Sequence, residues 1–150
     1  MTSSEKKTLN SVVVFQSLVL CDDIRHENNG KLLFVGVYSD VVQVARLPAQ
    51  LRSFALAIQA RVFANDRFPF SVSVKDPQGN ALLDANGELN YEGEQGRVIW
   101  LPLVMGPALL TTEGSYSVQI VLGDSAPIRE SFLVRKASSP EVRVTAATPN

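Results

Sequence analysis

The feature that most constrains the fold of this chain is a series of short apolar runs with a period of two, separated by turn-forming residues. In residues 70–75 and in Gly114–Leu122, apolar and polar side chains alternate. Residues 76–79, Asp-Pro-Gln-Gly, follow the first run, and residues 123–125, Gly-Asp-Ser, follow the second. Such alternation is typical of strands with one buried face, and Pro and Gly favour tight turns. The pattern therefore predicts antiparallel hairpins.

The same signals predict about nine short strands in an all-β, antiparallel two-sheet sandwich, Ig-like or jelly-roll-like, with at most one short helix. The other predicted strands are residues 11–20, 31–39 with a continuation at 40–45, 53–63, 81–84, 97–105, 128–135 and 141–145. Polar residues 21–30 and 84–94 are predicted loops, and Pro48 favours a helical turn over residues 48–52. Gly36 indicates a bulge or a close backbone approach, and Pro102 indicates an edge strand or a bulge.

Length and charge set the domain organisation and exclude several function classes. The 150 residues suit one domain, predicted over 11–147, with a disordered segment at 1–10 and a frayed end at 148–150. The net charge is −1 and no basic cluster occurs, which argues against a nucleic-acid partner. No apolar stretch reaches the roughly 18 residues of a membrane span, and no signal peptide is evident. We therefore expect a cytoplasmic protein that does not bind membranes.

Two chemical alternatives deserve a test. A cysteine-dependent enzyme would use Cys21 as nucleophile with His26 and Glu27 nearby, but Cys21 also continues an apolar run and so reads as a buried, inert thiol. A calcium site would need carboxylate and amide oxygens from loops. The candidate ligands are Asp22, Asp23 and Glu27 on one segment, and Asp76, Asp84, Asn86 and Glu88 elsewhere. Turn formation explains these polar residues equally well, so no metal or other cofactor is predicted.

Aromatic side chains offer a further binding chemistry. Trp100 and Tyr91 are the candidates for a carbohydrate or base platform, although a tryptophan in mid-strand is more often part of a core.

The most distinctive polar cluster is Asp22, Asp23, Arg25 and Glu27. It is interpreted either as a structural ion pair or as a binding patch, because functional residues concentrate on loops held by a rigid scaffold.

Several short motifs resemble a family of small bacterial proteins of unknown function. These are Cys21-Asp22-Asp23-Ile24-Arg25, Gly30-Lys31-Leu32, Gly36-Val37-Tyr38-Ser39, Leu47-Pro48 and the Asp-Pro-Gln-Gly turn of residues 76–79. The resemblance covers roughly residues 12–80 and implies a bacterial β-sandwich domain. It implies no activity, and no functional residue follows from it.

These observations favour a non-catalytic β-sandwich module for protein binding or assembly, with a loop-based calcium or carbohydrate module and a cysteine-dependent enzyme as alternatives. Residues 11–20 and 31–37 are apolar at both parities, although a sandwich strand needs only one buried face. A loop, another element or another subunit must cover the second face, and we expect a homodimer formed through a sheet face or edge. Residues 141–147 could also pair with a neighbour's edge.

Overall fold

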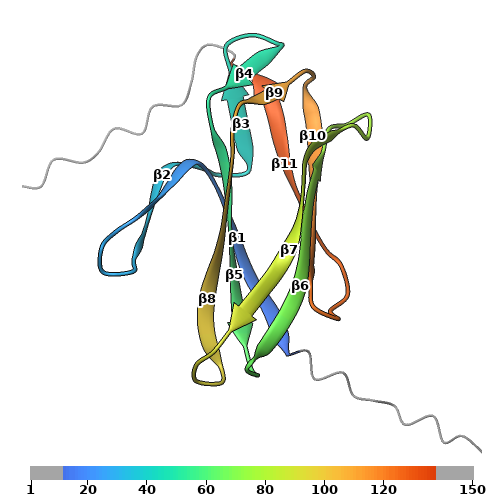
Figure 1. Ribbon diagram of the computed structural model, residues 1–150. Helices are drawn as coiled ribbons and strands as arrows, with labels where there is room; N and C mark the ends of the chain where they lie inside the picture. The colour runs from blue at the N-terminus through green and yellow to red at the C-terminus, as the bar shows by residue number, and fades with distance from the viewer. Residues whose placement is uncertain (1–11, 138–150) are drawn as a thin grey trace, which may run out of the picture.

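The computed structural model describes residues 12–137, which form two packed sheets and a short two-stranded ribbon, with no helix among them (Figure 1). Sheet A has the order β2-β1-β5-β8, with β1 Val13–His26, β2 Leu32–Tyr38, β5 Phe54–Val62 and β8 Arg97–Met105. Sheet B has the order β3-β11-β10-β6-β7, with β3 Val41–Val44, β6 Asp66–Lys75, β7 Ala81–Tyr91, β10 Gly114–Leu122 and β11 Ile128–Lys136. Strands β4 (Ala49–Leu51) and β9 (Ala108–Leu110) form the ribbon. The predicted all-β sandwich is therefore confirmed.

The hydrophobic core lies between the two sheets and is centred on β5 and β10. Side chains of alternate residues point inward from both strands, including Leu56 and Ile58 from β5 and Val118 and Ile120 from β10, all at most 1% exposed. The ring of Phe132 lies 5.4 Å from Tyr116 and 5.7 Å from Phe54, which joins the two sheets through aromatic contacts. Each fully buried side chain of this size stabilises the fold by about 1.5–3 kcal/mol.

The chain passes from sheet A to sheet B directly after β2. Ser39 and Asp40 carry it to β3, which lies parallel to β11, whereas the other strand pairs are antiparallel. The backbone N–H of Leu133 donates to the carbonyl of Asp40 over 2.8 Å, and that of Ala137 donates to Val44 over 2.8 Å. Of the predicted continuation at residues 40–45, Val41–Val44 therefore form a strand, but in the opposite sheet from β2.

Two predicted loops are largely strand. Residues 21–26 continue β1 and pair with β2 from Cys21 opposite Val37 to His26 opposite Leu32. The turn is confined to residues 27–30, where Gly30 has φ of +83° and donates its N–H to the Glu27 carbonyl. Residues 84–91 continue β7, which pairs with β6 over this length. The sequence pattern does not show this strand, because its outward side chains are polar and the inward Ala85 and Gly87 are too small to give an apolar signal.

The predicted helical turn at residues 48–52 is also wrong. Ala49–Leu51 is strand β4, which pairs with β9 at the end of the sandwich, and the Leu47–Pro48 peptide bond is cis. The predicted strand at residues 141–145 lies outside the described residues. The described residues form eleven strands rather than about nine. Strands β4 and β9 were too short to be recognised, and the predicted continuation at residues 40–45 is the separate strand β3.

Candidate binding surface

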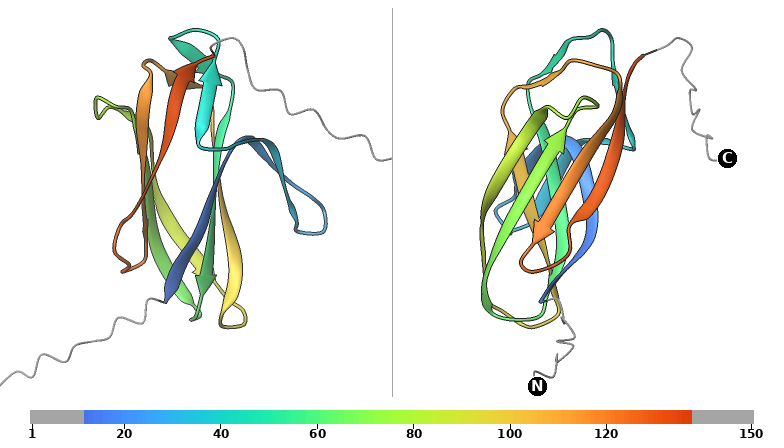
Figure 2. Two further views of the ribbon diagram at one scale, coloured as in Figure 1. Left: turned by 180° about the vertical axis from the view of Figure 1, so that it is seen from behind. Right: turned by 90° about the vertical axis from the view of Figure 1, so that its right-hand side faces the viewer.

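The hairpin formed by β1 and β2 bends away from the body of the sandwich (Figures 1 and 2). At the bend, Gly36 has φ of +65°, and a Cβ atom there would lie 2.2 Å from Oδ2 of Asp22. The hydroxyl of Tyr38 donates to the Asp22 carboxylate, and the hydroxyl of Ser53 donates to the Asp22 carbonyl over 2.6 Å. Only glycine fits this close approach without strain, so the expected role of Gly36 is confirmed.

Beyond the bend, the hairpin folds over the outer face of sheet A. Before it, Leu20 and Tyr38 pack into the core between the sheets, whereas after it Ile24 and Phe34 belong to a second apolar cluster. The rings of Phe34 and Trp100 pack edge to face, with their centroids 5.2 Å apart and an angle of 72° between their planes. Aromatic rings in this arrangement attract each other. The hairpin is therefore held against β8 by its own side chains.

The second cluster explains why the strands of sheet A are apolar on both sides. Its centre consists of Cys21 from β1 and Ala55 and Ala57 from β5, all 0% exposed although they point away from the main core. Their small side chains leave room for Phe34 and Trp100 to lie over them. The chain thus covers part of its own second face, which the sequence pattern left open between a loop, another element and another subunit.

The cover is incomplete, and apolar side chains remain exposed at both margins of the sheet. One cross-strand row runs Val104, Ala55, Cys21, Val37, and its outer members Val104 and Val37 are 51% and 60% exposed. On the far side of the hairpin, Leu33 and Val35 are 49% and 38% exposed. We call Leu33, Val35, Val37 and Val104 the apolar margin.

The opposite face of the molecule differs in character. The outward residues at the centre of sheet B are polar, including Ser115, Ser117 and Gln119 on β10, and Leu133 is the large apolar residue exposed on its β11 side. Exposed apolar side chains therefore concentrate on one side of this molecule. Contiguous apolar exposure marks interaction sites in soluble proteins.

The four residues of the predicted binding patch do not form one site. Asp23 and Arg25 lie opposite Val35 and Leu33 in the register, so they border the apolar margin, where Arg25 Nε lies 3.4 Å from Asp23 Oδ2. Asp22 instead accepts the Tyr38 hydroxyl at the bend, and Glu27 lies in the hairpin turn. The sequence pattern placed these four residues in a loop and could not separate the carboxylate that holds the bend from the exposed ones.

The structure does not bring the residues of the cysteine-enzyme alternative together. Cys21 and His26 lie on one extended strand, five residues or about 16 Å apart. The Cys21 thiol is buried and donates to the Asp23 carbonyl over 3.4 Å. Burial, followed by the negative charge of Asp22, raises the pKa of Cys21. A raised pKa keeps the thiol protonated and unreactive at neutral pH.

Among the candidate calcium ligands, Asp76 is engaged in local structure. The Asp76 carboxylate accepts the N–H groups of Gln78 and Asn80 over 2.9 Å each, which closes the turn between β6 and β7. Among residues 12–137, no three His, Cys, Asp or Glu side chains lie close enough together to hold a metal ion.

The aromatic platform candidates are also engaged. Trp100 packs against Phe34, and the Tyr91 hydroxyl donates to the Glu94 carbonyl.

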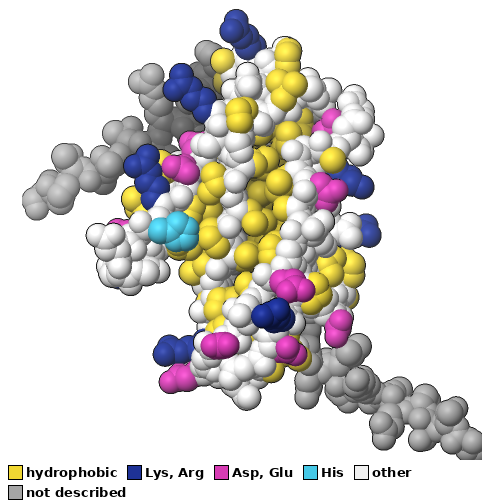
Figure 3. Space-filling model, viewed as in Figure 1, with side chains coloured by type: hydrophobic (Ala, Val, Ile, Leu, Met, Phe, Trp, Pro, Cys, Tyr) yellow, Lys and Arg dark blue, Asp and Glu magenta, His cyan; other side chains and the backbone are white. Residues whose placement is uncertain are grey.

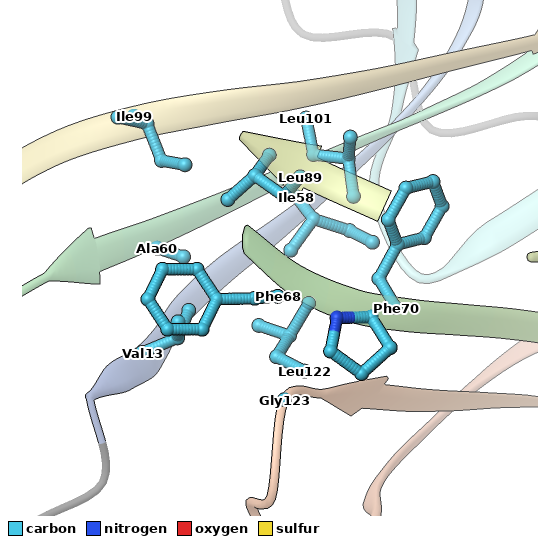
Figure 4. A pocket seen from close by; sticks show the side chains of 11 residues that line it. Val13, Ile58, Ala60, Phe68, Phe70, Leu89, Ile99, Leu101, Leu122 and Gly123 are labelled. Atoms are coloured by element: carbon cyan, nitrogen blue, oxygen red, sulfur yellow. The ribbon is translucent and has the colours of Figure 1, made fainter. Parts of the chain in front are cut away.

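An apolar cavity opens between the edge strands β7 and β8, where half-buried side chains are visible between the sheets (Figure 3). Leu89, Ile99, Leu101 and Phe70 line it together with residues of β5 (Figure 4). Its volume is about 10 Å³, the space of about one water molecule. The cavity is a packing defect rather than a ligand pocket.

The fold and the surface together define a β-sandwich with an apolar hairpin margin. The chain belongs to DUF6941, a family of unknown function, which matches residues 16–135. The sequence has no significant match among curated proteins. In the described part of the chain, no helix is long and apolar enough to cross a membrane.

Two solved structures show weak similarity. One is a β-glucosidase from Erythrobacter marinus, with a TM-score of 0.47 and 9% identity over 82% of this chain and 15% of that one. The other is a β-glucosidase from Listeria innocua in complex with isofagomine, with a TM-score of 0.43 and 8% identity over 83% and 16%. This chain thus spans less than a fifth of either enzyme, and the similarity carries no argument about its activity.

Proposed function

We propose that this protein is a non-catalytic β-sandwich module that binds protein, and that the hairpin with the outer face of sheet A is its binding surface. The observation that carries this proposal is the one-sided distribution of exposed apolar side chains. Among residues 12–137, six of the ten exposed large apolar residues lie on the hairpin or on the outward side of β1 and β8: Val14, Leu33, Val35, Val37, Val98 and Val104.

The chemistry of this surface suits a protein partner. Protein interfaces combine an apolar centre with a polar rim. Here Val37 and Val104 supply apolar area, and the Asp23–Arg25 pair supplies polar groups beside Leu33 and Val35. The fixed hairpin also lowers the ordering cost of binding, because Phe34 is already packed on Trp100.

The test compares one surface variant with one matched control. The surface variant carries Leu33→Ser, Val37→Ser and Val104→Ser, and the control carries Ser115→Ala, Ser117→Ala and Gln119→Ala on the exposed face of sheet B. Each protein is cross-linked in its native cells, and the cross-linked species are compared. We expect species that wild type and control share and the surface variant loses. Identical species for all three proteins would contradict the proposal.

A further inference from the structure

The free edge of β2 is a sheet edge that carries neither of the usual protections, charge or proline. Strands β2 and β8 end sheet A, and β3 and β7 end sheet B. Natural proteins guard such edges with proline, charge or short length. Strand β8 contains Pro102, β7 contains Asp84 and Glu88, and β3 has four residues. Strand β2 has seven residues without a charge or a proline.

We propose that this edge pairs with β2 of a second copy of the chain, antiparallel and centred on Leu33, to give a two-fold symmetric dimer in which the two hairpins form one four-stranded sheet. This inference rests on the proposed function, since it names the partner and the strand of the same surface.

Backbone groups on the free edge have the right direction for this pairing. The Glu27 N–H donates to the Lys31 carbonyl over 2.9 Å, which fixes which residues of β2 direct their backbone N–H and C=O groups toward β1. In an antiparallel pair, N–H and C=O groups of successive residues point to opposite sides. Leu33 and Val35 therefore bond to β1, whereas Leu32 and Phe34 direct their backbone groups to the free edge. With Leu33 at the centre, Leu32 of each copy lies opposite Phe34 of the other and exchanges hydrogen bonds with it.

Side chains on the exposed side of the hairpin are complementary to themselves in this register. Leu33 meets Leu33 of the second copy, and Lys31 lies opposite Val35 of the second copy. Since Asp23 neighbours Val35 in the register, each Lys31 ammonium approaches the Asp23 carboxylate of the other copy. The two Leu33 and two Val35 side chains, 49% and 38% exposed in one chain, then cover each other.

The symmetry of this arrangement favours a second copy over an unrelated strand. Apolar contacts lie at its centre, a Lys–Asp contact lies at each end, and no two like charges are directly opposite. The register uses residues 31–35, which precede the bend at Gly36. Opposite charges and apolar pairs across strands stabilise pairing, whereas like charges directly opposite destabilise it.

Engineered cysteines test the register. In a pair that does not exchange hydrogen bonds, opposite Cα atoms are about 4.5 Å apart, which a disulfide can span. We expect Leu33→Cys to form a covalent dimer on mild oxidation. Val35→Cys alone forms no covalent dimer, because the two positions are about 13 Å apart along the strand, but it cross-links with Lys31→Cys. The native Cys21 is buried and does not interfere. A disulfide in Val35→Cys alone, with none in Leu33→Cys, would overturn the proposed register.

Light scattering on the unmodified chain tests the dimer itself. We expect a mass that rises from one chain to two between about 1 µM and about 100 µM, the range of ordinary weak association. Val35→Lys places a lysine opposite Lys31 of the second copy but beside Asp23 in its own chain, so it weakens the dimer roughly tenfold or more while the monomer folds. Val35→Thr, which is uncharged and β-branched, retains the dimer.

The two proposals fail separately. A wild-type mass of one chain at every concentration, or equal association of wild type and Val35→Lys, would refute the β2 dimer. If cross-linked partners in cells still depended on the apolar margin, the binding function would stand with a different partner.

Discussion

Tyr38 connects the interior of the sandwich to the hairpin through one hydroxyl group. Its ring packs against the core and lies 6.1 Å from that of Phe54, while its hydroxyl donates to Asp22 at the bend. Burial raises the pKa of Tyr38, and the hydrogen bond to Asp22 raises it further. Ionisation of this phenol would place two negative charges in contact and remove the donor.

We expect Tyr38→Phe to reduce the free energy of unfolding by about 1–2 kcal/mol at pH 7, because a hydrogen bond to a charged acceptor is lost. Since the folded pKa is raised, this contribution is fully present below the ordinary tyrosine pKa of about 10 and is lost as the pH rises above it. Denaturant unfolding at pH 7 and pH 11 measures both effects. A difference between wild type and variant that stays constant over this range would contradict the assignment.

Cys21 is predicted to be inert in the folded protein. It is 0% exposed and covered by Phe34 and Trp100, and its pKa is raised. We expect a thiol reagent at pH 7 to modify the native chain more than about a hundredfold more slowly than the denatured chain, because reaction requires local opening. Rapid native labelling would instead show that the hairpin leaves the outer face of sheet A readily.

At the scale of elements, the bend of the hairpin depends on Gly36. We expect Gly36→Ala to reduce the free energy of unfolding by about 2–4 kcal/mol, from left-handed backbone strain and the collision with Asp22. Gly30→Ala is the matched control: its φ is +83° but nothing lies within 4 Å of the added Cβ, so it costs only about 1–2 kcal/mol. Equal losses in denaturant unfolding would show that Asp22 moves aside freely.

Strands with clear alternation could be predicted from the sequence, and those with small or polar residues could not. Residues 70–75 and 114–122 are recognisable as strands in the sequence because one face is apolar and the other is polar. The far half of β7 does not, since Ala85 and Gly87 face inward where Phe70 fills the space that a larger side chain would need. The ends of β1 and β7 are set by pairing with β2 and β6, which are long-range contacts that local pattern does not contain.

The candidate surface was only half accessible to sequence reasoning. The apolar character of both faces of residues 11–20 and 31–37 signalled a covered second face. The packing of Phe34 on Trp100 joins residues 66 positions apart, and only the fold brings them together. The sequence also grouped Asp22, which holds the bend, with the more exposed Asp23 and Arg25, because only the fold shows which carboxylate accepts the Tyr38 hydroxyl.

At the scale of the whole molecule, stability is expected to be independent of calcium. The carboxylates of Asp22 and Asp76 are occupied by hydrogen-bond donors of the chain itself. Millimolar calcium acting on a micromolar site would add about 4 kcal/mol to the free energy of unfolding. We expect the melting temperature to be the same with calcium and with a chelator. A rise of several degrees would favour the loop-based calcium module instead.

The parallel pairing of β3 with β11 has a consequence for the order in which the protein is made. Three strands of sheet A, β1, β2 and β5, are complete once Val62 has left the ribosome, whereas β3 finds its partner only when the last described strand emerges. Until β10 and β11 arrive, the inner face of β5 has no opposing sheet to cover it. The nascent chain therefore carries its most apolar strand without its full cover while residues 63–113 are made, a stage at which exposed apolar surface promotes aggregation.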